Sequence, residues 1–185
     1  MTIKSIDALR DEADVVLADN TTQAITAADL RNLILDMLDT VQPAHSMIAL
    51  NSLPIALNAA PQALAPFNSV VLDTPGFYTA DLPNGTIEHT AGAPVIEDVV
   101  TASGNVSGPN GSDISLILFH NGSATPFSVA VSTAGPGNVI GFTLSGLLRT
   151  TGNAVFEVRA FGAAGNYTFT NVKLSASRQP VRSFV

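Results

Sequence analysis

The sequence predicts a mainly β protein, an antiparallel jelly-roll sandwich preceded by a short two-helix N-terminal segment. Turn signals rich in Gly, Asn and Pro recur along the second half of the chain, and the runs between them are rich in Val, Ile, Phe and Thr. No helical pattern separates these runs, which favours antiparallel pairing over a parallel sheet. An apolar stripe with helical spacing near the start of the chain predicts the N-terminal helices.

Two short helices are expected before the sandwich. The first is expected at 5–18, and the second opens at Thr26, with Asp29 in the capping-box position, and ends at Pro43. The apolar face of the second helix consists of Leu30, Leu33, Ile34, Met37, Leu38 and Val41. Two short helices cannot bury such a stripe between themselves. We therefore expect these residues to pack in an oligomer or to attach the chain to a larger assembly.

The chain divides into three expected parts. Residues 1–45 are expected to form a helical attachment or oligomerisation segment, and 67–185 are expected to form the jelly-roll head. Residues 46–66 are rich in Pro and Ala, so they are expected to form a linker or a first edge strand.

Strands are expected throughout the head. Their ranges are 86–90, 95–103, 113–119, 127–133, 139–148, 154–161 and 167–176. In NAVFEVRAF, Phe156 and Val158 share one face while Glu157 and Arg159 share the other, so this strand is expected to have one wet side.

The run DISLILFHNG differs because both of its faces are apolar. Ile114, Leu116 and Leu118 point to one side, whereas Ile117 and Phe119 point to the other. Two interpretations stay open. The second face lies on the three-fold axis of a trimer, or it belongs to a central strand covered by the second sheet and a loop of the same chain.

The last expected strand changes its alternation midway. Tyr167 and Phe169 belong to one alternating set of positions. Val172 and Leu174 belong to the other set, so an unbroken strand would expose one of the two pairs. A β-bulge or strand bend is therefore expected near residues 170–171.

Composition excludes several classes of function. The net charge is −7 and the only lysines are Lys4 and Lys173, so no basic cluster predicts binding to nucleic acid or to a membrane. No cysteine is present, which excludes disulfides and thiol chemistry. The N-terminus has no signal-peptide pattern and no run has the length of a membrane span, so synthesis and folding in a cytoplasm are expected.

No catalytic, cofactor or metal site is expected. His45, His89 and His120 lack the spacing of a metal site and are expected in turn and surface roles. Glu97 and Asp98 are adjacent on a strand and point to opposite faces, so they cannot cooperate as acid and base; solvated or interface positions are expected for them. The glycine-rich GPGNVIG leads into a β pattern rather than the helix that a phosphate loop requires.

Two stretches resemble known protein families. LADNTTQAITAADLRNLILDMLDTV, residues 17–41, resembles the N-terminal helical segment of many tailed-bacteriophage virion proteins, which precedes an exposed C-terminal module. Residues 52–180, with ISLILFHNG, VFEVRAFG and NYTFTNVKLSAS, resemble the trimeric tumour-necrosis-factor-like jelly rolls that phages use as fibre and head-spike knobs. The G-x-Y strand common in such jelly rolls is matched only loosely, by PGFYTAD.

The resemblance implies a non-enzymatic structural protein on the surface of a tailed-phage virion, made in the cytoplasm of the host bacterium. It would be a homotrimeric fibre, spike or head-decoration protein, anchored to capsid, collar or tail proteins by its N-terminal helices. The knob would serve host attachment through a surface glycan or protein, with Ile117 and Phe119 in the trimer interface. The alternative is a carbohydrate-binding, lectin-like β-sandwich, for which the absence of Trp leaves few stacking platforms.

Overall fold

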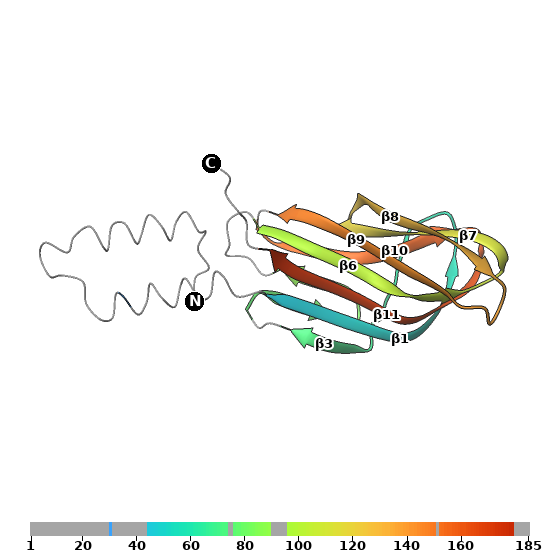
Figure 1. Ribbon diagram of the computed structural model, residues 1–185, viewed down its shortest axis with the longest axis horizontal. Helices are drawn as coiled ribbons and strands as arrows, with labels where there is room; N and C mark the ends of the chain where they lie inside the picture. The colour runs from blue at the N-terminus through green and yellow to red at the C-terminus, as the bar shows by residue number, and fades with distance from the viewer. Residues whose placement is uncertain (1–29, 31–43, 74–75, 90–95, 151, 180–185) are drawn as a thin grey trace, which may run out of the picture.

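The computed structural model describes residues 30, 44–73, 76–89, 96–150 and 152–179. These residues form two sheets packed face to face as a sandwich (Figure 1), and every strand pair in it is antiparallel. The mainly β, antiparallel sandwich predicted from the sequence is thereby confirmed, and it is consistent with a jelly roll.

The two sheets draw on strands from distant parts of the sequence. The first sheet has the spatial order β3 (Ser69–Asp73), β1 (His45–Leu57), β11 (Gly165–Gln179), β6 (Ile96–Ser107) and β9 (Ile140–Thr150). The second has the order β4 (Tyr78–Asp81), β5 (Thr86–His89), β10 (Ala154–Gly162), β7 (Asn110–His120) and β8 (Ser123–Ala134), and the two-residue β2 (Gln62–Ala63) pairs with β10. Strands β5 to β11 lie where the sequence predicted strands.

The core lies between the inward faces of the two sheets. Its largest fully buried side chains include Phe156 from the second sheet and Tyr167 and Phe169 from the first. The rings of Phe142 and Phe169 meet edge to face, with centroids 6.2 Å apart. Burial of each such ring stabilises the fold by about 1.5–3 kcal/mol, so these inward residues account for much of the sandwich's stability.

Residues 46–66, for which a linker or first edge strand was predicted, instead belong to the sandwich. They contain most of β1, which lies between β3 and β11 inside the first sheet. Ile48 and Leu50 point into the core, but after position 50 the phase changes, and Leu53 and Ile55 become the inward residues. This change of phase, together with the Pro and Ala content, hides the period-two pattern of a strand.

Nearly all of the predicted N-terminal helical segment lies outside the described residues. Leu30 is described, has a helical conformation and is 45 % exposed. The other residues of the predicted stripe, Leu33, Ile34, Met37, Leu38 and Val41, lie outside the described residues. Their role in attachment or packing therefore stays a prediction.

The bulge predicted in the last strand is present in β11. The register between β11 and β6 shifts by one residue between Thr170 and Lys173, and Asn171 has a positive φ of 52°. The extra residue allows the aromatic set before it and the aliphatic set after it to point into the same core. Gly104 of β6 lies opposite the bulge, where a Cβ atom would come within 2.9 Å of the Cα atom of Val172.

A second close approach joins the two sheets at their β8–β9 edge. A Cβ atom on Gly146 would lie 2.2 Å from the ring of Phe127, whereas one on Gly141, in the same strand, would meet nothing nearer than 3.6 Å. We expect Gly146→Ala to lower the free energy of unfolding by about 1–3 kcal/mol, because the Phe127 ring must move. Gly141→Ala is the matched control and should leave stability unchanged or raise it by about 0.4–1 kcal/mol. Urea unfolding of both variants measures the difference, and equal midpoints would contradict the predicted contact.

Candidate functional site

Exposed apolar side chains gather on the outward face and edges of the first sheet, near the end at which β1 begins. Val70, Val71 and Leu72 belong to β3 at one edge, and Leu147 belongs to β9 at the other edge (Figure 1); they are 45–54 % exposed. Met47 of β1 and Val99 of β6 point outward between them and are half-buried. We call these six residues the basal patch.

The row of side chains that joins the two edges is uncharged. The strand register places one residue from each strand in a row across the sheet, namely Leu72, Met47, Ser175, Thr101 and Ser145. The hydroxyl oxygens of Thr101 and Ser145 lie 2.9 Å apart within this row. Charged residues lie on both sides of this row: Lys173 lies two residues before Ser175 on the same face, and Glu97 lies opposite Arg149 closer to the end of the sheet. Depletion of charge next to exposed apolar side chains is typical of the core of a protein interface.

The basal patch occupies both edges of one sheet, so two copies of the chain can meet edge to edge. An interface that joins one edge of a copy to the opposite edge of the next uses two different surfaces, and such heterologous contacts close into a ring when the rotation permits. The patch is therefore suited to a cyclic oligomer of identical chains.

Ile117 and Phe119 lie on the outward face of the second sheet, away from the basal patch. Phe119 is 6 % exposed because the guanidinium of Arg159 lies 4.3 Å from its ring centroid. Arg159 in turn forms an ion pair of 2.6 Å with Glu157, so the predicted wet side of β10 is partly covered by its own charged side chains. Ile117 is half-buried. The prediction that Ile117 and Phe119 form a trimer interface is not tested by the structure of one chain and stays a prediction.

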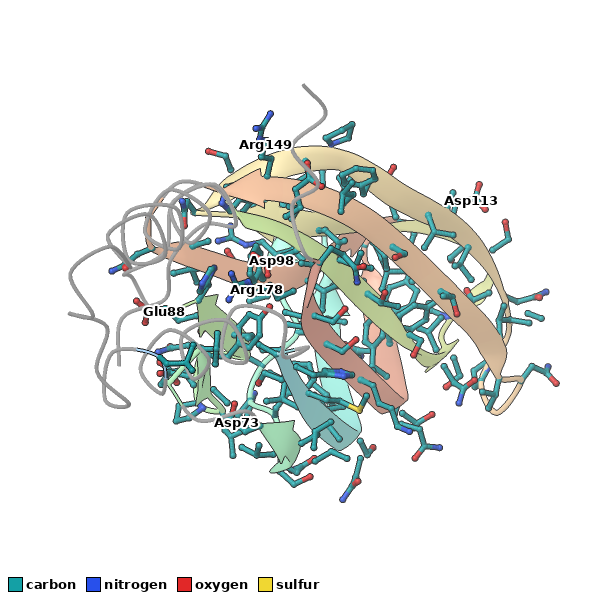
Figure 2. The ribbon with its side chains drawn as sticks, turned by 60° about the vertical axis from the view of Figure 1, so that its left-hand side comes forward. Asp73, Glu88, Asp98, Asp113, Arg149 and Arg178 are labelled. Atoms are coloured by element: carbon teal, nitrogen blue, oxygen red, sulfur yellow. The ribbon has the colours of Figure 1, made fainter. Side chains whose placement is uncertain are left out.

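A cluster of polar side chains is buried between the sheets at the end at which β1 begins. The Tyr78 hydroxyl donates a hydrogen bond of 2.5 Å to Oδ1 of Asp98. Nδ1 of His89 lies 3.4 Å from Oδ2 of the same carboxylate, and neither of these two atoms has a hydrogen-bond partner of good geometry among the described residues. Arg178 is the cross-strand neighbour of Asp98, and Figure 2 shows the two side chains close together. We call these four residues the polar cluster.

The polar cluster links both sheets because Tyr78 and His89 come from β4 and β5, and Asp98 and Arg178 from β6 and β11. Burial raises the pKa of Tyr78 far above its ordinary value, and the charge of Asp98 and its hydrogen bond act in the same direction. Burial lowers the pKa of Arg178, an effect that the neighbouring Tyr78 and Asp98 oppose. Tyr78, His89 and Asp98 are each at most 3 % exposed, so a substrate cannot reach them in this structure.

The polar cluster corrects two expectations. His89 was expected in a turn or surface role, but it is buried because its strand places it on the inward side with Ile87. Asp98 was expected to be solvated or at an interface, but it is fully buried. Glu97 and Asp98 do point to opposite faces, as predicted. The burial of Asp98 could have been predicted from the alternation of β6, because Asp98 lies on the same side of the strand as Val100 and Ala102, which line the core.

Two other kinds of feature, a metal-binding cluster and a membrane-spanning helix, are absent from the described residues. They contain no group of three or more His, Asp or Glu side chains arranged to hold a metal ion. They also contain no helix that is long and apolar enough to cross a membrane.

Comparisons with known proteins define the class of fold. No protein-family model matches the chain, and neither does any curated protein sequence. Among solved structures, the chain is similar to the Eiger TNF structure from S. frugiperda, with 10% identity, 77% of this chain and 99% of that chain covered, and a TM-score of 0.53. The sandwich is therefore a TNF-like jelly roll, as the sequence resemblance implied.

Two further solved structures are similar at lower scores. The globular domain of the zebrafish complement 1qA protein has 15% identity and a TM-score of 0.43, and covers 75% of this chain and 98% of that chain. Murine APRIL at pH 5.0 has 9% identity and a TM-score of 0.49, and covers 73% of this chain and 99% of that chain.

Proposed function

We propose that the chain is a non-enzymatic structural protein of a tailed-phage virion, in which three copies form the exposed knob of a fibre, spike or head decoration. The TNF-like jelly roll supports the knob, and the resemblance of residues 17–41 to phage virion segments supports the assignment to a virion. The N-terminal segment attaches the knob to capsid, collar or tail proteins, and the knob stands on the virion surface and serves host attachment.

The basal patch is the single observation that supports self-association most strongly. A monomer would leave Val71 and Leu147 about half exposed, at 54% and 53%, although an uncharged row of side chains joins their two edges. Burial of each side chain stabilises an oligomer by about 1.5–3 kcal/mol, and a ring of three copies buries each position three times. Light scattering after size exclusion should give the mass of a trimer at micromolar concentration.

Removal of the N-terminal segment is expected to separate folding from incorporation into particles. A chain that starts at Ala44 keeps every strand of the sandwich, including Ile48 and its partners on β11. It should give a β-rich circular dichroism spectrum with cooperative melting, and it should be absent from purified particles in which the full chain is detected. The start must lie before His45, because a chain that begins near Leu50 would lose more than a third of β1.

Two outcomes would contradict this division of roles. A chain from Ala44 that is unfolded would show that the sandwich needs the residues before it. A folded chain that joins particles as well as the full chain would show that attachment lies in the jelly roll. Localisation of the full chain on the particle by electron cryomicroscopy tests the virion assignment itself.

A carbohydrate-binding, lectin-like role is the second candidate. It is favoured by a polar hollow on the outward face of the first sheet, lined by residues of β6, β9 and β11. This role is compatible with the first, because a trimeric knob that attaches a particle to a host needs a ligand on the host surface.

A further inference from the structure

A shallow hollow of about 510 Å³, wide open to solvent, lies beside the β11 bulge on the outward face of the first sheet. Its side chains come from three adjacent strands: Ser103 and Asn105 from β6, Thr143 from β9, and Asn171 and Lys173 from β11. We call this feature the bulge hollow. It lies on the same face as the basal patch, toward the other end of β6 and β9, and Lys173 is exposed in the single chain.

The hollow exists because of two local features of the chain. The bulge gives Asn171 a left-handed conformation and displaces β11 relative to β6. Gly141 lines the hollow and has no side chain to fill it, and a Cβ atom on Gly141 would meet nothing nearer than Asn105 Oδ1 at 3.6 Å. β-Bulges occur often beside binding sites because they re-aim side chains and interrupt strand pairing.

The lining has a specific chemistry. Lys173 is its only charged residue, is exposed, and forms no ion pair with a described residue. Around it stand the amides of Asn105 and Asn171, which both donate and accept hydrogen bonds, and the hydroxyls of Ser103 and Thr143. One cation surrounded by amides and hydroxyls is complementary to a ligand with one carboxylate and several hydroxyl groups.

The hollow has no aromatic platform for a sugar ring. Phe142 contributes to the lining, but its ring is 5 % exposed and packs against Phe169 in the core. Recognition would therefore depend on hydrogen bonds and on the single ammonium group. Such a site is weak alone, and linked copies raise the overall affinity by about 10²–10⁴ when they engage a polymer together.

We propose that the bulge hollow binds an acidic sugar of a host-surface polysaccharide, with the ammonium of Lys173 on the sugar carboxylate and the Asn and Ser/Thr side chains on its hydroxyl groups. The inference rests on the proposed role in host attachment and names the class of ligand for it. Neutral sugars would lose the charged contact, and small anions would lose the contacts to hydroxyl groups.

The test uses the full chain and a matched set of small probes. Glucuronic acid and glucose differ at one carbon, so NMR titration of the two isolates the contribution of the carboxylate. Acetate and phosphate provide the anion without the sugar. We expect glucuronic acid to shift the amide signals around the hollow, and to bind at least about tenfold more tightly than glucose or acetate, as a charge-assisted contact predicts.

Variants locate the site. Lys173→Met should weaken binding of glucuronic acid about tenfold, whereas Lys173→Arg should retain most of it because the charge is kept. Gly141→Leu should prevent binding by placing an apolar side chain inside the hollow, at a position where a Cβ atom meets nothing nearer than 3.6 Å. Ser128→Leu, at an exposed position of β8 on the other sheet, is the matched control and should bind like the wild type.

Each remaining outcome overturns the inference. Equal binding of acetate or phosphate and glucuronic acid would make the hollow a site for small anions rather than sugars. Absence of binding, or binding that Gly141→Leu leaves intact, would place the ligand elsewhere. Light scattering on the same samples separates this inference from the proposed assembly, since a trimer that binds no sugar contradicts the hollow alone, and a monomer that binds contradicts the trimer alone.

Discussion

The double variant Val71→Asp/Leu147→Asp is expected to be a folded monomer, whereas the wild type is expected to be a trimer. The two residues lie on opposite edges of the first sheet and are about half exposed, at 54% and 53%, so the single chain does not need them for its core. In a closed ring each interface would receive carboxylates in place of apolar side chains, at a desolvation cost of several kcal/mol per charge. Light scattering gives the mass, and circular dichroism shows that the sandwich is intact.

The same measurement compares the two surfaces that have been assigned to the trimer. Ile117→Asp places a carboxylate on the outward face of the second sheet, in the interface that the sequence predicted. If Ile117→Asp remains a trimer and the double variant is a monomer, the interface lies at the basal patch. If Ile117→Asp is a monomer and the double variant remains a trimer, the interface lies on the face of Ile117. A wild-type monomer, or three species with the mass of a trimer, would contradict the basal patch.

The sequence predicted those parts of the fold in which one face of a strand is apolar and turns are marked by Asn-Gly. The hairpin between β7 and β8 is an example, since Asn121 and Gly122 both have positive φ and fix the turn between two alternating runs. The bulge in β11 was predictable for the same reason, because the change of parity between Phe169 and Val172 requires an extra residue if both are to face one core.

Other features depend on contacts between distant strands, which a linear pattern does not contain. β1 changes phase together with β11, so its alternation is readable only beside its partner. β3 is exposed along its whole length and has no buried face to reveal it. The bulge hollow requires the register of three strands, since Asn105, Gly141 and Asn171 are far apart in the sequence.

Asp98→Ala is expected to cause the largest loss of stability among single substitutions in the polar cluster. It would remove the acceptor of the Tyr78 hydroxyl and the carboxylate beside Arg178, and leave both groups without this partner inside the protein. Loss of the hydrogen-bond partner of a buried group costs about 1–3 kcal/mol, and more where a charge is involved, which is a large share of the roughly 5–15 kcal/mol that stabilises a domain. Asp98→Asn keeps the shape and one acceptor oxygen, so it should cost less.

Glu97→Ala provides the matched control, because the two carboxylates are adjacent in β6 and Glu97 points outward beside Arg149. An exposed pair of this kind contributes at most about 1 kcal/mol. Chemical unfolding of the three variants should therefore rank them Glu97→Ala, Asp98→Asn and Asp98→Ala in order of increasing loss. Because Asp98 bonds a residue of the other sheet, the loss should appear as weaker docking of the two sheets, with faster amide exchange in β4 and β5. Equal stability of Glu97→Ala and Asp98→Ala would show that the buried carboxylate does not hold the sheets together.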